Sequence, residues 1–392
     1  MKIAIITSGI LPVPAVQGGA VENLIDFCLE YNDKLHLHDI TVYSVFHPDI
    51  KGHTALNSKV NKYLYIKTNT VWGKIQKKIY KFIHGNNGYY QYAIEYFLAR
   101  VISYIRYQQF DIILIENRPG YVLKLKDTFS AKFVIHQEND YINNQIKNSH
   151  DIYNNTTLII NTSNYLTQQV RTINKEDKKC VTVLNGIDTA HFYNATAINR
   201  EKLGFNNDDF IIVYSGRLTK SKGILQLIQA IKQTTDIPNI KLLIIGASSY
   251  GVDKHPTSFV RQLEKETESI RNQVIFTGYI NYQQVPSYLK MADIAVVPSM
   301  WEEPFGLTVV EAMAAGLPLI TTRSGGIPEI CEGVAMIVER DNIVDYLSAA
   351  ILDLYQHTEK RQQMAAASLE RSKFFDKETY AKHFFAALES IK

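Results

Sequence analysis

Residues 301–326, WEEPFGLTVVEAMAAGLPLITTRSGG, contain side chains whose type and spacing could do chemistry. Glu303 and Glu311 lie eight residues apart in an otherwise apolar segment, and Pro304 and Gly306 follow the first glutamate. A carboxylate accepts hydrogen bonds from hydroxyl groups, a glycine lets the backbone approach a ligand, and a helix N-terminus favours an anion. A purely structural explanation stays open here, because an acid and a proline also suit the first turn of any helix.

Glycine-containing loops also follow three other predicted strands. Gly19 stands where a helix is expected to begin, Gly246 ends an apolar run, and the segment SGRLTKSKG (215–223) contains Arg217 and Lys222. Each loop alone is ordinary turn chemistry. Loops at equivalent strand ends, combining glycines, helix N-termini and two cations, together predict a site for a diphosphate.

Short apolar runs rich in Ile and Val alternate with helical patterns in two series along the chain. The first series is 2–8, 40–46, 111–117, 132–138, 158–163 and 180–185, and the second is 210–216, 241–247, 274–279, 293–299 and 317–323. Continuous apolar strands between helices predict parallel sheets covered on both faces, so two series predict two doubly wound α/β domains. Ligands are then expected at the carboxyl ends of the strands. The joint is expected near 184–192, and the last helical pattern could pack on either domain.

Composition excludes several classes of protein. A length of 392 residues predicts two domains, and a net charge of +3 is too small to indicate a nucleic-acid-binding protein. Cys28, Cys180 and Cys331 are far apart without a CxxC pair, which predicts reduced thiols in a cytoplasmic protein and no zinc site. No apolar run approaches the roughly 18 residues of a membrane span, and the N-terminus fits a buried strand better than a signal peptide. GxGxxG, GxxxxGK[ST] and Asp-x-Asp motifs are absent, which argues against a dinucleotide-dependent dehydrogenase, a P-loop and a carboxylate-bound metal.

The combined pattern resembles the GT-B glycosyltransferases of the retaining family four (glycosyl transferases group 1), marked by two glutamates separated by seven residues. Here that mark is Glu303-PFGLTVV-Glu311. The resemblance covers nearly the whole chain and includes QGGAVENL (17–24), VLNGID (183–188), SGRLTKSKG (215–223), LIIG (243–246), FTGYI (276–280), 292–320 and GGIPEI (325–330). It implies two Rossmann-like domains facing across a cleft, an acceptor-side domain 1–190 and a nucleotide-sugar-binding domain 191–374. The last helix, 375–392, would pack back on the first domain.

The resemblance also implies roles for matching residues. Glu303 would hydrogen-bond the hydroxyls of the donor sugar, and Glu311 would hold both ribose hydroxyls. Arg217 and Lys222 would neutralise the diphosphate, and His136 matches a histidine near the reacting carbon, although a satisfied histidine at a strand end stays an alternative. The remaining nucleotide-sugar-binding positions would be Gly19, Gly246, Tyr279, Ile280, Phe305, Gly306 and Leu307.

The implied activity is that of a hexosyltransferase. A sugar would move with retention from a nucleoside-diphosphate sugar, with UDP favoured and GDP next, to an acceptor hydroxyl. The resembling proteins indicate bacterial cell-surface polysaccharide or spore-coat synthesis, with no metal and no other cofactor required. Two alternatives stay open: another enzyme on the same fold, such as a nucleotide-sugar epimerase, and a non-catalytic partner subunit.

Two short segments of the first domain, ENRPGY (116–121) and HQEND (136–140), follow predicted strands. They could contribute to a site for a glycan, lipid-linked or protein-linked acceptor, or they could be satisfied loop residues. The candidate acceptor-side residues are Glu116, Asn117, Arg118, Glu138 and Asn139.

A lysine-rich stretch distinguishes the first domain. Between Asp49 and Glu95 there are eight lysines and no acidic residue. Within it, 72–83 places apolar residues roughly on one helical face and lysines opposite. The apolar residues are Trp72, Ile75, Ile79, Phe82 and Ile83, and the lysines are Lys74, Lys77, Lys78 and Lys81. Such a helix can lie on an anionic membrane, which would make the protein peripheral on the inner face, or its apolar face can pack into the domain core.

Overall fold

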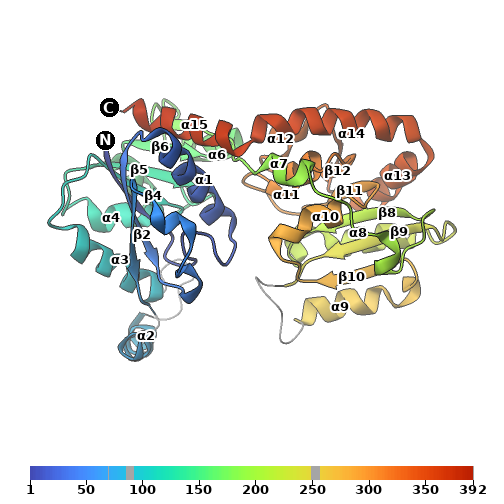
Figure 1. Cartoon of the computed structure of the whole chain (residues 1–392), viewed down its shortest axis with the longest axis horizontal. Helices are drawn as coiled ribbons and strands as arrows, with labels where there is room; N and C mark the ends of the chain where they lie inside the picture. The colour runs from blue at the N-terminus through green and yellow to red at the C-terminus, as the bar shows by residue number, and fades with distance from the viewer. Residues whose placement is uncertain (69, 85–91, 249–256, 392) are drawn as a thin grey trace. The chain divides into compact units, whose positions relative to one another are not determined.

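The computed structural model describes residues 1–68, 70–84, 92–248 and 257–391, which form two compact units (Figure 1). The first unit comprises Met1–Gly186 and Lys377–Lys392, and the second comprises Ile187–Asp376. The boundary between the two units therefore follows Gly186. This position is within the predicted joint 184–192 and four residues before the predicted end of the first domain at 190. The last helix belongs to the first unit.

The first unit, as far as the structure describes it, is built on a seven-stranded sheet in the order β3-β2-β1-β4-β5-β6-β7 with every neighbouring pair parallel. The strands are β1 (Lys2–Ile6), β2 (Asp39–Val45), β3 (Asn61–Ile66), β4 (Ile112–Glu116), β5 (Lys132–Gln137), β6 (Leu158–Asn161) and β7 (Cys180–Thr182). Side chains alternate between the two faces, so that Ile3 and Ile5 enter one core while Ala4 and Ile6 enter the other.

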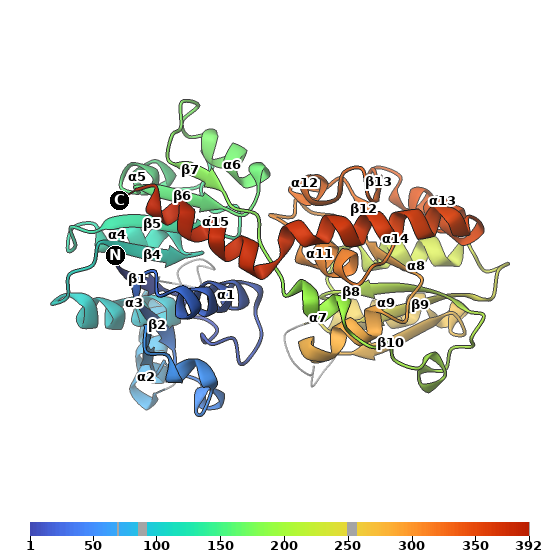
Figure 2. The same ribbon diagram turned by 45° about the horizontal axis from the view of Figure 1, so that its top comes forward.

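Helices cover both faces of this sheet. They are α1 (Ala20–Leu35), α2 (Val71–His84), α3 (Tyr92–Ile105), α4 (Val122–Leu125), α5 (Ser149–Asn154), α6 (Asn164–Arg171) and α15 (Lys377–Glu389). One core is closed by α3, α4 and α5, and the other by α1 and α15, which lie side by side (Figure 2). Tyr31 of α1 stacks on Phe385 of α15 with ring centroids 6.1 Å apart.

The described part of the second unit contains a six-stranded parallel sheet in the order β10-β9-β8-β11-β12-β13. Its strands are β8 (Phe210–Ser215), β9 (Ile240–Ile245), β10 (Val274–Gly278), β11 (Ile294–Val297), β12 (Leu319–Thr322) and β13 (Met336–Val338). The helices are α7 (Thr189–Tyr193), α8 (Ile224–Lys232), α9 (Ser258–Glu266), α10 (Val285–Leu289), α11 (Leu307–Ala314), α12 (Ile327–Cys331), α13 (Ile343–Gln356) and α14 (Thr358–Ser372). One sheet face packs on α8, α9 and α13, while α11 packs on α7, α12 and α14.

Strand order reverses at β1/β4 in the first sheet and at β8/β11 in the second. In open parallel sheets, ligands bind outside the carboxyl ends of the strands at such a reversal. The α/β class with two doubly wound parallel sheets, predicted from the sequence, is confirmed. The short strands β3 and β13 were not among the predicted apolar runs, because their sequences, NKYLYI and MIV, are too polar or too short to stand out.

Candidate active site

The loops after β8 and β11 are packed against each other in the second unit. Gly223, at φ +71°, ends a short 3-10 helix over Lys220–Lys222, and a Cβ at this position would lie 1.7 Å from the carbonyl oxygen of Pro298. The backbone N–H of Met300 donates to the carbonyl of Ser221 at 2.8 Å. Only glycine at 223 therefore lets the loop that carries Lys222 approach the loop that leads to Glu303.

The carboxylate of Glu303 is held by two donors. Its Oε1 accepts hydrogen bonds from the Lys222 ammonium at 2.6 Å and from the Ser299 hydroxyl at 2.7 Å. The Glu303 side chain is only 7% exposed and that of Lys222 is 22% exposed. The ammonium also lies 5.5 Å from the centre of the Trp301 ring. The structure thus brings together the residues predicted to hold the sugar and the diphosphate.

The double glycine at 325–326 fixes the backbone of Glu303. The N–H of Gly326 donates to the carbonyl of Glu303 at 2.8 Å. A Cβ on Gly325, which has φ +52°, would lie 2.2 Å from that same carbonyl oxygen. The Ser324 hydroxyl donates to the carbonyl of Ser299 at 2.9 Å, which ties the end of β12 to the end of β11. The double glycine is therefore part of the support of the site.

Helix α11 begins directly after this loop. Its N-cap is Gly306, at φ +122° and without a side-chain hydrogen bond, so the first N–H groups of α11, from Leu307 onward, carry no side-chain cap. Phe305 is buried against Phe375 with ring centroids 5.9 Å apart. Uncapped N–H groups at a helix start are suited to an anion or a sugar hydroxyl.

Glu311 lies within α11 and is 7% exposed. Burial raises the pKa of Glu311 to about 7, and a hydrogen bond from the Tyr282 hydroxyl opposes that rise. Tyr282 follows the predicted base-binding pair Tyr279 and Ile280, of which Tyr279 is 42% exposed. The sequence reasoning missed Tyr282, although FTGYINY places it two residues beyond the motif.

Gly246 and Arg217 lie at the ends of neighbouring strands. A Cβ on Gly246 would lie 1.9 Å from the carbonyl oxygen of Gly216, so this glycine allows the loops after β8 and β9 to approach each other. Arg217 is exposed, and its guanidinium makes no hydrogen bond or ion pair with any residue that the structure describes. It is therefore available to a ligand at the carboxyl edge of β8.

In the first unit, Gly19 precedes α1 and borders a buried acid. At φ +112°, a Cβ on Gly19 would lie 2.2 Å from Oε2 of Glu22. Burial, aided by the nearby Glu116 and Glu138 carboxylates, raises the pKa of Glu22 to about 7. Glu22 was not predicted as a site residue, although it lies in the quoted segment QGGAVENL.

His136, on β5, lies between two glutamates. Its Nδ1 is 2.8 Å from Glu116 Oε2, and its Nε2 is 3.1 Å from Glu138 Oε1. Burial alone lowers the pKa of an imidazole, but the two carboxylates outweigh it and raise the pKa of His136 to about 10. The ring also packs on Phe384 with centroids 5.1 Å apart. These contacts are those of a protonated imidazole paired with Glu116 and Glu138. A contact between His136 and a donor sugar stays a prediction.

Three of the five residues predicted on the acceptor side, Glu116, Asn117 and Glu138, contact this histidine. The N–H of Asn117, a residue with φ +52°, donates to the carbonyl of His136 at 2.8 Å, and its Oδ1 accepts from the N–H of Glu138 at 3.2 Å. Glu138 Oε2 accepts from Asn185 at 2.7 Å. Arg118 and Asn139 are partly exposed beside this cluster in the chain. Asn185, from the segment VLNGID, is a further member that the sequence reasoning did not single out.

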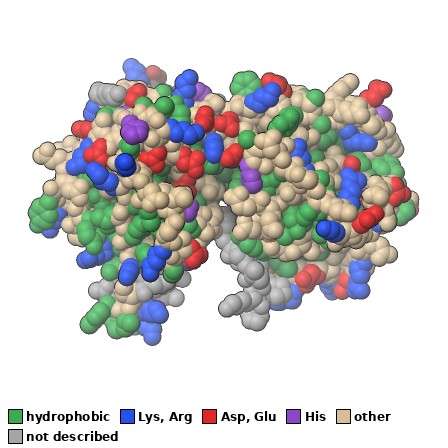
Figure 3. All heavy atoms as spheres, viewed as in Figure 1, with side chains coloured by type: hydrophobic (Ala, Val, Ile, Leu, Met, Phe, Trp, Pro, Cys, Tyr) green, Lys and Arg blue, Asp and Glu red, His purple; other side chains and the backbone are tan. Residues whose placement is uncertain are grey.

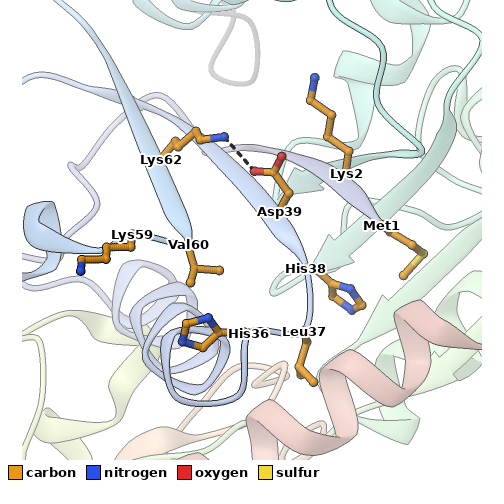
Figure 4. A pocket seen from close by; sticks show the side chains of 9 residues that line it. All are labelled: Met1, Lys2, His36, Leu37, His38, Asp39, Lys59, Val60 and Lys62. Carbon is orange, nitrogen blue, oxygen red and sulfur yellow. Dashed lines mark hydrogen bonds and ion pairs between the residues drawn. The ribbon is translucent and has the colours of Figure 1, made fainter.

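A pocket of about 640 Å³ lies at the amino ends of the strands of the first sheet, away from the carboxyl ends that carry the residues described above (Figure 4). It is lined by Met1, Lys2, His36, Leu37, His38, Asp39, Lys59, Val60 and Lys62. Lys62 pairs with Asp39 at 3.1 Å, and the ammonium groups of Lys2 and Lys59 point away from them in Figure 4. No predicted site residue lines this pocket, which lies at the amino ends of the strands.

His136 gives stability a specific pH dependence. Its pKa is higher in the folded protein than the unperturbed value of about 6.5, so its stabilising contribution is complete below that pH and is lost as the pH rises toward 10. We expect the difference in the free energy of unfolding between wild type and His136→Gln to be larger at pH 7 than at pH 10. Urea unfolding followed by circular dichroism at both pH values measures it.

The control replaces His150, an exposed histidine of the same unit, with glutamine. This variant should unfold like the wild type at both pH values. A stability difference for His136→Gln that stays constant from pH 7 to pH 10 would show that the imidazole is not held protonated by Glu116 and Glu138.

Comparison with known proteins finds similar sequences along most of the chain. Residues 196–371 match the sequence model described as "Glycosyl transferases group 1". The chain is 27% identical over 385 residues to spore coat protein SA of Bacillus subtilis, covering 94% of this chain and 93% of that protein. It is 28% identical over 367 residues to the putative glycosyltransferase YtcC of Bacillus subtilis, covering 90% of this chain and 82% of that protein.

Solved structures resemble the whole chain. Anabaena Alr3699/HepE in complex with UDP is similar at a TM-score of 0.74 and 20% identity, with both chains fully covered. Sucrose-phosphate synthase from Thermosynechococcus elongatus is similar at a TM-score of 0.76 and 19% identity, covering 100% of this chain and 99% of that one. The chain is therefore a glycosyltransferase of the GT-B fold, and its residues 196–371 match the group 1 glycosyl transferases.

Proposed function

We propose that this enzyme is a retaining hexosyltransferase of bacterial cell-surface glycan synthesis. It takes the sugar from a nucleoside-diphosphate sugar, with UDP preferred and GDP next, and transfers it to an acceptor hydroxyl. The observation that carries this proposal is the 2.6 Å pair of Lys222 and Glu303 beside the uncapped start of α11. A cation for a diphosphate and a carboxylate for sugar hydroxyls lie there side by side.

Lys222 can serve both groups at once. An ammonium has three N–H donors, and one of them is directed at Glu303, so two are left for phosphate oxygens. The exposed guanidinium of Arg217, from the same loop, adds a second cation. Glu303, held by Lys222 and Ser299, keeps carboxylate lone pairs for donor-sugar hydroxyls.

The reaction then needs positioning and charge stabilisation. The bond between the anomeric carbon and the diphosphate oxygen breaks, the acceptor oxygen attacks the same face, and its proton passes to the leaving phosphate oxygen. Arg217, Lys222 and the N-terminus of α11 stabilise the negative charge that grows on the diphosphate. By analogy with oxyanion-hole donors, removing one such group costs about 3–4 kcal/mol, or on the order of 10²–10³ in rate.

The acceptor side is proposed to use the buried acids of the first unit. Glu116 and Glu138 are held by His136, and amides of Asn117 and Asn185 surround them. Carboxylates and amide oxygens accept hydrogen bonds from hydroxyl groups, so a sugar hydroxyl is a suitable ligand. A glycan, lipid-linked or protein-linked acceptor would each present one.

The names of similar proteins support the donor and the pathway class. Alr3699/HepE has been solved with UDP and with UDP-glucose. Lipopolysaccharide 1,2-N-acetylglucosaminetransferase of Salmonella typhimurium is 30% identical over 165 residues, covering 40% of this chain and 43% of that protein. A GDP-mannose-dependent mannosyltransferase of Corynebacterium glutamicum is 31% identical over 194 residues. Its name supports GDP as the second candidate for the donor nucleotide.

Donor turnover without a divalent ion is the direct test. We expect one nucleotide sugar of a UDP- and GDP-sugar panel to be hydrolysed slowly, and faster with a crude lipid extract, in the presence of EDTA. The reason is that Arg217, Lys222 and a helix N-terminus already meet the diphosphate charge. Release of the nucleoside diphosphate is measured by chromatography.

Other outcomes of this assay have distinct meanings. A new nucleotide sugar formed without release of the nucleoside diphosphate would indicate an epimerase. No turnover of any donor under any condition would indicate a non-catalytic partner subunit. Activity abolished by EDTA and restored by Mg²⁺ or Mn²⁺ would contradict the metal-free site.

Alanine variants of the two glutamates, Glu303 and Glu311, should differ in their effects on nucleoside-diphosphate affinity and on kcat. Glu311→Ala should weaken the affinity for the free nucleoside diphosphate about 10–100-fold, since a hydrogen bond to a charged group contributes about 1.5–3 kcal/mol. Glu303→Ala should leave this affinity equal or slightly higher, because Lys222 is released, yet lower kcat about 10²–10³-fold. Calorimetry and initial rates measure the two effects.

Glu332, whose side chain is 66% exposed in the same unit, provides the control. Glu332→Ala should change neither quantity. Equal losses of nucleoside-diphosphate affinity in Glu303→Ala and Glu311→Ala would show that the assigned division of roles is wrong.

The helix α2 presents an uncovered apolar face. Trp72 is 74% exposed and Phe82 is 93% exposed, and Ile75 and Ile79 between them are 46% and 55% exposed. The alternative that these side chains fill the core of the first unit is therefore wrong. Figure 3 shows hydrophobic and basic side chains together at the position that α2 occupies in Figure 1. Among the described helices, none has the length and hydropathy needed to cross a bilayer.

We propose that α2 docks the enzyme on an anionic membrane surface at the cytoplasmic face. Lys74 and Lys78 are exposed on the flank of the apolar face, and the sequence adds Lys77 and Lys81. Each lysine near an anionic surface contributes about 1 kcal/mol, screened over about 8 Å at physiological salt. Trp72 and Phe82, at the two ends of the apolar face, can insert into the lipid layer and add a hydrophobic contribution to the charge attraction.

Liposome sedimentation at two salt concentrations measures this binding. The wild type should pellet with anionic vesicles, and less so as salt rises, while replacing Lys74, Lys77, Lys78 and Lys81 with Gln should release it. Donor hydrolysis without lipid should be unchanged, because the replaced lysines lie in α2, whereas Arg217, Lys222, Glu303 and Glu311 lie in the second unit. In a Trp301→Phe background, Trp72 fluorescence should shift to shorter wavelength on binding.

Replacing Lys51 and Lys59, exposed lysines of the same unit outside α2, with Gln is the matched control and should leave pelleting unchanged. The variant Trp72→Ser with Phe82→Ser keeps every charge and should lose the tight binding. No pelleting of the wild type with any vesicle would remove the membrane proposal and leave the donor chemistry untouched.

A further inference from the structure

Glu302 lies beside Glu303 in the chain but makes different contacts. One of its carboxylate oxygens, Oε2, accepts the backbone N–H of Gly325 at 2.6 Å. The other, Oε1, forms an ion pair with the guanidinium of Arg340. Arg340 also lies 3.5 Å from the carbonyl oxygen of Met300 through Nη1. No functional role was predicted for Glu302 or Arg340 from the sequence.

These contacts connect the carboxyl ends of three neighbouring strands. Met300 and Glu302 follow β11, Gly325 follows β12, and Arg340 follows β13 by two residues. Gly325 is next to Gly326, whose N–H holds the carbonyl of Glu303. A displacement of Glu302 would therefore move both the chain before Glu303 and the glycine pair that supports it.

The ion pair between Arg340 and Glu302 contributes little to the free energy of unfolding. The side chains of Arg340 and Glu302 are 31% and 46% exposed, and ion pairs with this exposure contribute about 0–1 kcal/mol. Their contacts instead restrict the 300–306 loop. Since Glu303 has to meet a sugar hydroxyl within hydrogen-bonding distance, a small displacement has a large cost.

We propose that Arg340 and Glu302 are positioning residues that hold the loop carrying Glu303 in the geometry that binds the donor sugar. The inference rests on the proposed donor role of Glu303. Arg340 acts through Glu302 and the Gly325–Gly326 backbone and touches no part of the donor. Its contribution therefore concerns the sugar moiety and leaves the nucleotide contacts of Glu311 unaffected.

Arg340→Gln should separate affinity for the sugar from affinity for the nucleotide. Calorimetry with UDP and UDP-glucose, and in parallel with GDP and GDP-mannose, identifies the pair that binds. For that pair, the affinity for the free diphosphate should stay within about twofold, while the affinity for the sugar nucleotide and kcat should fall about tenfold, since misplacement by 1 Å can cost up to about 10²-fold. Arg340→Lys, which keeps the charge, should recover part of the loss.

Arg323→Gln is the matched control. Arg323 is 48% exposed, lies at the end of β12, and pairs with Glu339 at 2.8 Å instead of Glu302. It should behave as the wild type in every assay. Glu302→Gln keeps an oxygen for the Gly325 N–H but loses the charge, so it should fall between wild type and Arg340→Gln.

Hydrogen exchange without ligand tests the positioning independently of any activity. The backbone amides of 300–303, 305–306 and 325–326 should exchange faster in Arg340→Gln than in the wild type and in Arg323→Gln, with an unchanged melting temperature. If the wild type turns over no nucleotide sugar, the proposed function fails while the exchange result still decides the positioning role. Unchanged exchange in Arg340→Gln, or equal losses of UDP and UDP-glucose affinity, would overturn the inference.

Discussion

The opposite charges of Lys222 and Glu303 are held 2.6 Å apart at the carboxyl ends of a parallel sheet, and the loops that carry them are packed around this pair. Their two loops follow β8 and β11, which are neighbours in the sheet. The backbones of these two loops come into contact at Gly223, where a Cβ would collide with Pro298. The loop after β12 approaches Glu303 in the same way at Gly325, so both glycines support the position of the charge pair.

The first unit buries three carboxylates close to one another. Glu22, Glu116 and Glu138 are all buried near the ends of β1, β4 and β5, where carboxylates repel each other and lack water. A single imidazolium, His136, sits between two of them, and the third acid, Glu22, has a raised pKa. Burying unpaired charge is costly, so the pairing and the pKa shift are two ways of lowering the same cost.

Sequence reasoning was most successful where the signal is local. The long apolar runs predicted the parallel strands, and the spacing of Glu303 and Glu311 around Pro304 and Gly306 placed one acid before a helix and the other within it. It also predicted Lys222 and Glu303 near one ligand, and the structure places them in contact.

The features that escaped prediction depend on which strands become neighbours. Arg340 and Glu302 are 38 residues apart in the chain and meet only because β13 pairs with β12 and β12 with β11. Tyr282 follows β10 and contacts Glu311 of α11, although β9 and β8 separate β10 from β11 in the sheet. The exposure of Trp72 and Phe82 also needed the structure, because amphipathic periodicity is the same for a helix that covers a core and for one that does not.

The place of α15 in the chain has a consequence for biosynthesis. Tyr380, Phe384 and Leu388 are buried in the core that α1 helps to close, yet they are translated after the whole of the second unit. At about 5–20 residues per second, roughly 10–40 s of translation separate Gly186 from Lys377. During that interval the apolar side of α1 lacks its partner helix. The first unit, although it begins first, can therefore close this core only after the whole of the second unit has been translated.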